Sequence, residues 1–132
     1  VAAKYDFIGI AMHEFSEIMG RIGVMGSPIT GTPDYMMYDL FHYTGAATRG
    51  LNNGASRFQS INNGTTLVKA FNNASVNGGD LQDWASGTND AFNAFSTIGV
   101  MNDLTAVGTQ AMDVIGYGGT GVPVELSKFT IE

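Results

Sequence analysis

Apolar residues recur with helical spacing near the beginning of the chain. Four of them follow one another at intervals of four, three and four residues: Ile8, Met12, Phe15 and Met19. This spacing lines one side of an α-helix, and Asp6 is of a residue type that caps helix N-termini. The pattern predicts a helix over residues 6–20, ended by Gly20, whose apolar side can be buried. His13 and Glu17, four residues apart, would stand together on another side of it.

Turn residues and an aromatic patch follow the predicted helix. Gly and Pro recur over residues 23–33 and predict consecutive turns. Residues 34–43 are rich in Tyr, Met and Phe, so we expect this segment to be at least partly buried. Residues 56–68 predict a short hairpin around the Asn-Asn-Gly sequence at 62–64, because these residue types accept positive φ in tight turns.

The second half of the chain predicts two further helices. Residues 72–87 are expected to be a loop except around Trp84. A short helix is predicted over residues 90–95 and a longer one over 104–115, with Gly116 beyond its end as a C-cap. We expect one α+β domain over residues 1–117, and a Gly-rich linker with a terminal strand over 118–132. Both ends of the chain suggest a piece of a longer exported precursor.

Composition and charge narrow the classes of function. The chain has 132 residues, enough for about one domain, and no cysteine, so neither a disulfide framework nor a thiolate metal site is possible. Twelve acidic against six basic residues give a net charge of −6, which argues against nucleic acid and anionic lipid as partners. No apolar run reaches the roughly 18–20 residues of a membrane span. Peptides, small molecules and cations fit this composition better.

The motif HEFSE, residues 13–17, carries the strongest chemical signal. On a helix, His13 and Glu17 project one above the other and can reach a single divalent cation, with Glu14 beside the open coordination position. A metal-bound water loses its proton near neutral pH, and Glu14 could accept that proton and pass it to a leaving amine. The alternative is an i, i+4 ion pair between Glu17 and Arg21 on a solvated face, with His13 as a half-buried polar residue.

Four motifs, in the same order along the chain as in a known family, support a resemblance to that family. HEFSEIMGR at residues 13–21 is followed by DLFHY at 39–43, GGDLQDW at 78–84 and MDVIGY at 112–117. Together they resemble the metzincin metallopeptidases, and most closely a bacterial secreted metalloprotease-like family. His13, Glu14 and Gly20 match the metzincin pattern, whereas Glu17 and Gly23 stand where its second and third histidines belong.

The resemblance implies an activity and an incomplete fold. It implies a secreted, zinc-dependent endopeptidase that acts on peptides or proteins, with Glu14 as base and His13 and Glu17 as zinc ligands. The fold would be a metzincin-like lower half: an active-site helix, a Met-turn-like loop, small antiparallel strands and a C-terminal helix. The N-terminal sheet subdomain is absent from this chain, so an upstream fragment or a second copy would cover the apolar face.

The patch at residues 35–43 would supply the remaining site residues. By resemblance to the Met-turn, Met36 would form the floor of the site and Tyr38 would steady the metal or the oxyanion. Since Gly23 has no side chain to offer, the third metal ligand would be Asp39, His42 or a residue on a segment that this sequence does not include. For all four residues the alternative is structural: core packing for Met36, Tyr38 and His42, and a buried cap or turn hydrogen bond for Asp39.

Three hypotheses for the function of the whole chain stay open, along with one secondary cation site. Asp80 and Asp83 stand in an oxygen-rich loop that could hold calcium, with a solvated turn as the alternative. The leading hypothesis is a secreted zinc peptidase. Its competitor is a catalytically inactive binding or surface module on the same scaffold, which the departures at Glu17 and Gly23 favour. A further, structural hypothesis is an assembly subunit that uses its apolar face as an oligomer contact.

Overall fold

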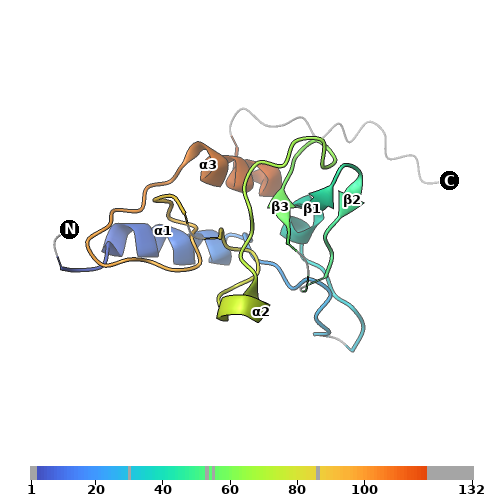
Figure 1. Cartoon of the computed structure of the whole chain (residues 1–132), viewed down its shortest axis with the longest axis horizontal. Helices are drawn as coiled ribbons and strands as arrows, with labels where there is room; N and C mark the ends of the chain where they lie inside the picture. Colours follow the sequence, from blue (N-terminus) through green and yellow to red (C-terminus); the bar gives the residue numbers. More distant parts are fainter. Residues whose placement is uncertain (1–2, 30, 53, 55, 86, 119–132) are drawn as a thin grey trace.

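The computed structural model describes residues 3–29, 31–52, 54, 56–85 and 87–118 of the chain. Within them the chain forms a small α+β fold of three α-helices and one three-stranded antiparallel sheet (Figure 1). The predicted α+β class is confirmed at this level. The strand predicted after residue 118 lies outside the described residues.

Helix α1 (Phe7–Ile18) matches the predicted first helix. The Asp6 side chain accepts a hydrogen bond from the Ile8 backbone N–H at 3.2 Å, which confirms the predicted N-cap. Gly20 follows with a φ of +111°, a conformation that ends the helix at little cost for glycine. The prediction of a buried apolar side is wrong for much of α1, because exposed fractions are between 63% and 82% for Phe7, Ile8, Phe15 and Ile18.

The sheet places β1 (His42–Gly45) between β2 (Thr48–Arg49) and β3 (Phe58–Gln59). In this antiparallel arrangement His42 lies opposite Gln59, and Tyr43 lies between Arg49 and Phe58. Asn63 and Gly64 both have positive φ, which confirms the predicted turn. The returning segment pairs through the Gln59 N–H to the Lys69 carbonyl at 2.8 Å, and the Val68 N–H to the Gln59 carbonyl at 2.9 Å.

The core lies between the two long helices and the sheet, and is aromatic at its centre. Its buried members come from segments far apart in the sequence: Tyr38, Phe71, Trp84, Ala91, Phe92, Ala111 and Val114. The 3-10 helix η1 (Met37–Phe41) delivers Tyr38, which confirms that part of the aromatic patch is buried. Trp84 forms backbone bridges to both Phe71 and Asn93, and so ties the loops on either side of it together.

The remaining helices differ in part from the predictions. Helix α2 (Ala74–Asn77) is a single turn inside the predicted loop. Helix α3 (Ala106–Met112) starts two residues after the predicted onset, where Thr105 caps it by accepting from the Gly108 N–H. It continues into the π-helical turn η2 (Asp113–Tyr117), in which Gly116 has a φ of +108°.

The helix predicted over residues 90–95 is wrong. This segment forms turns: the Asn93 N–H donates to the Asp90 carbonyl at 3.2 Å, and two further backbone hydrogen bonds join the segment to Trp84. The Trp84 N–H donates to the Phe92 carbonyl at 2.8 Å, and the Ala94 N–H donates to the Trp84 carbonyl at 3.1 Å. The same pairing brings Ala91 and Asp83 toward α1.

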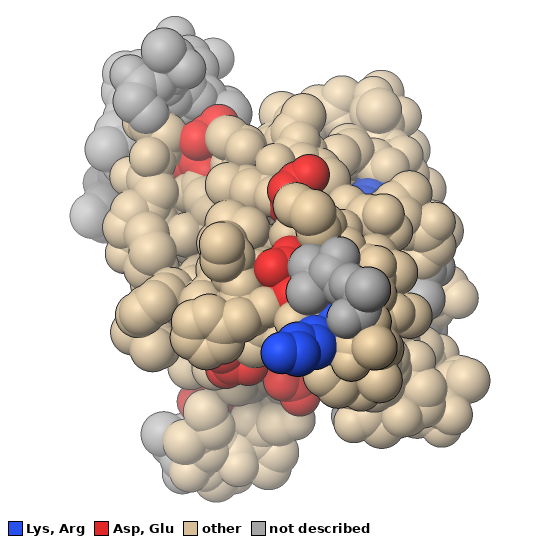
Figure 2. Space-filling model, turned by 90° about the vertical axis from the view of Figure 1, so that its left-hand side faces the viewer, with Lys and Arg blue, Asp and Glu red and all other residues tan. Residues whose placement is uncertain are grey.

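The described surface carries few charged groups. On the face that includes the N-terminal end of α1, acidic side chains are scattered among uncharged ones (Figure 2). None of the described helices combines the length and the apolar character that crossing a membrane requires.

Candidate metal centre

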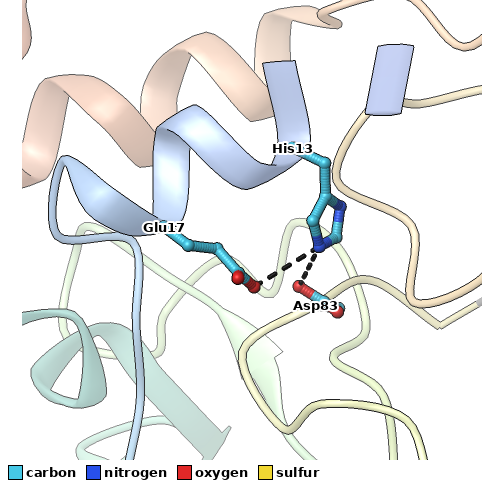
Figure 3. Close-up of side chains that lie close together, drawn as sticks. All are labelled: His13, Glu17 and Asp83. Carbon is cyan, nitrogen blue, oxygen red and sulfur yellow. Dashed lines mark ion pairs between the residues drawn. The ribbon is translucent and has the colours of Figure 1, made fainter. Parts of the chain in front are cut away.

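His13 and Glu17 lie one turn apart on α1 and approach each other as predicted. The His13 Nε2 atom is 3.3 Å from a Glu17 carboxylate oxygen (Figure 3). Both side chains are partly buried, with exposed fractions of 15% and 20%, so solvent and small ligands can still reach them. The helical spacing alone produces this pairing.

A third ligand-type group comes from a distant loop. Asp83 Oδ1 lies 3.5 Å from His13 Nε2, and its side chain is almost fully buried (Figure 3). Sequence analysis placed Asp83 with Asp80 in a candidate calcium loop, but the structure places Asp83 beside His13 and Glu17, while Asp80 is exposed. The motif match at residues 78–84 was the signal that could have linked this loop to the site.

The second nitrogen of His13 fixes the orientation of the ring. Its Nδ1 atom is 2.9 Å from the Ala91 carbonyl oxygen. A carbonyl can only accept, so we infer that Nδ1 carries the hydrogen and that Nε2 presents its lone pair to the two carboxylates. Three electron-rich atoms face one another here, and a proton on Nε2 or a cation among them is needed to hold them together.

The spacing of these atoms suits a small divalent cation. The three ligand atoms lie within 4.8 Å of one another. Tetrahedral zinc with bonds of about 2.0–2.2 Å to nitrogen and oxygen requires neighbouring ligand atoms about 3.3–3.5 Å apart. The two distances from His13 Nε2, 3.3 Å to Glu17 and 3.5 Å to Asp83, fall in this range. One imidazole and two carboxylates fit zinc in chemistry, the two carboxylate oxygens lie within 4.8 Å of each other, and a backbone carbonyl behind the histidine is a typical outer-shell partner.

Arg21 contacts Glu17 and Asp83 from the buried side of the group. Its guanidinium is fully buried, donates to Asp83 Oδ1 at 2.8 Å, and lies 3.7 Å from Glu17 Oε1. The predicted alternative pair between Glu17 and Arg21 is therefore present, although Arg21 is buried and not on a solvated face, and it coexists with the approach of Glu17 to His13. Burial raises the pKa of Asp83 above its ordinary value of 3.8, although the positive charge of Arg21 opposes this. The neighbouring cation therefore does not fully offset the burial of this carboxylate.

Asp39, a predicted candidate for the third ligand, is used elsewhere. Its Oδ2 atom accepts from the backbone N–H groups of Val24, Met25 and Met36 at 2.9–3.2 Å, which is the turn and cap role stated as the alternative. A Cβ atom on Gly23 would lie 2.6 Å from Asp39 Oδ1. A glycine at this position therefore lets the turn pack against the carboxylate.

His42, the other candidate ligand, lies in the core. Its ring stacks on Phe71 with centroids 3.4 Å apart, and its Nδ1 atom is 3.3 Å from an Arg57 nitrogen. Among the described residues, the one group with metal-ligand spacing contains neither His42 nor Asp39. Burial, and then the positive charge of Arg57, hold the pKa of His42 well below its ordinary value of 6.5.

This buried neutral imidazole predicts acid sensitivity of the fold. Below about pH 6.5 the unfolded chain binds a proton at His42 that the folded chain does not, so the free energy of unfolding should fall by about 1.4 kcal/mol per pH unit on this account. His42→Phe preserves an aromatic ring against Phe71 but cannot titrate. Urea unfolding between pH 5 and 7 should show a shallower pH dependence for the variant than for the wild type. Equal slopes for the two proteins would contradict the conclusion that His42 stays neutral in the folded chain.

Tyr38 and Met36 also have structural surroundings. The Tyr38 hydroxyl donates to Gln59 Oε1 at 2.9 Å in the core, and burial raises its pKa well above the ordinary value. Met36 is half-buried and precedes η1, where its N–H donates to Asp39. The described contacts of both residues are those of the packing alternative and do not include the His13 group.

Glu14 borders a hollow that it shares with His13. It is exposed on α1 next to His13, and the two residues line a common hollow of about 110 Å³, together with Ile10, Asn93, Ala94 and Ser96. A small molecule or the backbone of a peptide in this hollow would touch His13 and Glu14, whereas Glu17 and Asp83 do not line it.

The chain matches no protein-family model, no curated protein and no solved structure. The geometry of the centre therefore carries the functional argument.

Proposed function

We propose that this protein is a metal-dependent peptidase whose zinc ion is held by His13, Glu17 and Asp83. The observation that carries the proposal is the approach of two carboxylate oxygens to His13 Nε2 at 3.3 and 3.5 Å, with Nδ1 tied to the Ala91 carbonyl. Both distances fall in the range that separates neighbouring ligand atoms around tetrahedral zinc. Three protein ligands leave a fourth position for water or substrate, the arrangement of catalytic rather than structural zinc.

The side chains around the centre have separate roles in this proposal. Bound zinc supplies Lewis-acid activation of water and of a substrate carbonyl. The exposed Glu14 carboxylate, next to His13, would accept a proton from the attacking water and pass it to the leaving amine. His13, Glu17 and Asp83 keep fixed positions because Ala91, Gln82 and Arg21 hold them from behind: Gln82 donates to Glu17 at 2.9 Å, and Arg21 donates to Asp83 at 2.8 Å.

The resemblance to metzincins supports the same activity. It adds secretion, a peptide or protein substrate, and an N-terminal subdomain that would form the other wall of the substrate cleft. The surface that an upstream fragment or a second copy would cover is the exposed apolar side of α1, formed by Phe7, Ile8, Phe15 and Ile18. An apolar hollow of about 250 Å³ between α1 and α3 continues this surface.

The direct test is hydrolysis of an unfolded protein by the full chain. We expect zinc-loaded protein to cleave a fluorescently labelled casein, to lose this activity in a chelator such as 1,10-phenanthroline, and to regain it when zinc is restored. Magnesium in place of zinc serves as the control, because it prefers octahedral oxygen sites. Activity that survives complete removal of metal would contradict the mechanism.

One observation favours the competing function of an inactive binding module. Arg21 approaches the same carboxylate oxygens that face His13, so a protonated His13 and Arg21 together could balance Glu17 and Asp83 without any metal ion. Metal analysis of the purified protein separates the two functions. Stoichiometric zinc that is lost in Glu17→Ala favours the peptidase, and a metal-free protein of equal stability favours the module.

A further inference from the structure

Arg21 stands behind the proposed zinc site with an unusual set of contacts. Its Nη1 atom is 2.8 Å from Asp83 Oδ1, and its Nη2 atom is 3.7 Å from Glu17 Oε1. These are the same two oxygen atoms that lie 3.5 and 3.3 Å from His13 Nε2. Each carboxylate therefore presents one oxygen both to the metal position and to the guanidinium.

Several further contacts hold the guanidinium in this position. Nε donates to Ser16 Oγ at 2.8 Å, and Ser16 Oγ donates to the His13 carbonyl at 2.6 Å. Nη1 also donates to the Gln82 carbonyl at 3.3 Å, and the Phe92 ring lies 4.3 Å from the guanidinium carbon. Arg21 is thus held in place by α1, by the loop that carries Asp83, and by the core. A planar, permanently charged group is suited to bridging two carboxylates in this way.

Nη2 of Arg21 is the incompletely satisfied part of this arrangement. It is buried, has no hydrogen-bond partner among the residues that the structure describes, and lies 3.7 Å from Glu17 Oε1, too far for a hydrogen bond. The guanidinium therefore pairs with Asp83 through Nη1 and faces Glu17 through Nη2 without a hydrogen bond.

From these contacts we infer that Arg21 is a built-in counter-cation of the metal centre, a positioning residue that orders Glu17 and Asp83 when no metal is bound and weakens their hold on the metal when it is. The inference rests on the proposed function for the identity of the ion. Two carboxylates with Arg21 carry a net charge of −1, and without Arg21 they would carry −2. A divalent ion must therefore bind close to a fixed positive charge, which lowers its affinity. The same charge removes the repulsion between the carboxylates, so the fold does not depend on the metal.

Thermal unfolding with and without zinc tests this inference in the full chain. Arg21→Met removes the charge and preserves much of the side-chain volume. In chelator we expect this variant to unfold at a lower temperature than the wild type, because Glu17 and Asp83 then repel each other without compensation. Excess zinc should raise its unfolding temperature by more than it raises that of the wild type. This metal-dependent gain is a readout that a purely structural arginine would not alter.

Arg57→Met is the matched control, because Arg57 is also fully buried but contacts His42 and Asn72. Arg57→Met should unfold at a lower temperature than the wild type in chelator. Its rise in unfolding temperature on addition of zinc should be no larger than that of the wild type. If Arg21→Met does not fold with or without zinc, Arg21→Gln takes its place, since a glutamine also removes the charge but retains hydrogen-bond donors. Its zinc-induced gain must again exceed the wild-type gain, and a gain no larger overturns the inference.

The same experiment separates this inference from the proposed function. An equal zinc-induced gain in the wild type and in the Arg21 variant overturns the inference and leaves the zinc site standing. A gain in the Arg21 variant alone supports the inference and contradicts the peptidase, because Arg21 would then fill the site in place of the ion. No gain in either protein overturns both.

Discussion

Glu14→Gln is expected to lower the rate of peptide hydrolysis by about 10²–10⁴-fold and to leave the bound zinc in place. The magnitude is that of removing a general base that is positioned next to the reacting water. Glutamine has the same shape as glutamate but cannot accept the proton. Glu14 is exposed and is not a member of the metal-ligating group, so zinc content and affinity should stay at wild-type values. The measurement is kcat/KM on a fluorogenic peptide, with zinc content determined on the same samples.

Stability provides the control for this variant. An exposed substitution away from caps and core contacts normally changes the free energy of unfolding by no more than about 0.5 kcal/mol. The loss of rate should therefore occur in a protein that is as stable as the wild type. A Glu14→Gln variant that keeps wild-type activity would show that another group acts as base.

Asp83→Ala is expected to have the largest combined effect on metal binding and on stability. Removing this carboxylate removes one of the three ligands, which should cost more than the roughly 10–100-fold in affinity that loss of an outer-shell partner costs. It also leaves the buried Arg21 without its closest anion, at 2.8 Å, which should lower the free energy of unfolding by about 3 kcal/mol. Isothermal titration with zinc and urea unfolding measure the two effects separately.

Asp80→Ala is the matched control, because it makes the same substitution in the same loop at an exposed position. Zinc affinity and stability should both remain near the wild-type values. Equal effects of the two substitutions would mean that Asp83 has no special role, and a selective loss of calcium binding in Asp80→Ala would revive the calcium site that sequence analysis considered.

The parts of the fold that depend on neighbouring residues could be predicted from the sequence. The capping residue Asp6 and the terminating Gly20 bound α1 as expected, and Asn63 and Gly64 adopt the positive φ values that the turn needs. The short segment after Asp90 shows the limit of local patterns. Its phenylalanine spacing suggested a helix, but strand-like pairing with Trp84 takes up its backbone groups.

In the candidate site, too, only the contacts between residues close in sequence could be predicted. His13 and Glu17 could be paired from their spacing, because helix geometry fixes it. The contact of Asp83 with His13 could not be predicted, because the two residues are 70 positions apart and are brought together by the packing of Trp84. Patterns among neighbouring residues do not indicate such a contact. Asp39 and His42 lie in an aromatic patch whose burial could be predicted, but whether a buried polar residue binds a metal or satisfies the core depends on its tertiary partners.

Anomalous diffraction from a zinc-soaked crystal, recorded at the zinc absorption edge, tests the metal centre most directly. The structure predicts one peak about 2.0–2.2 Å from His13 Nε2 and from one oxygen each of Glu17 and Asp83. A crystal with no peak there, in which His13 donates its Nε2 hydrogen to the two carboxylates, would contradict the zinc centre.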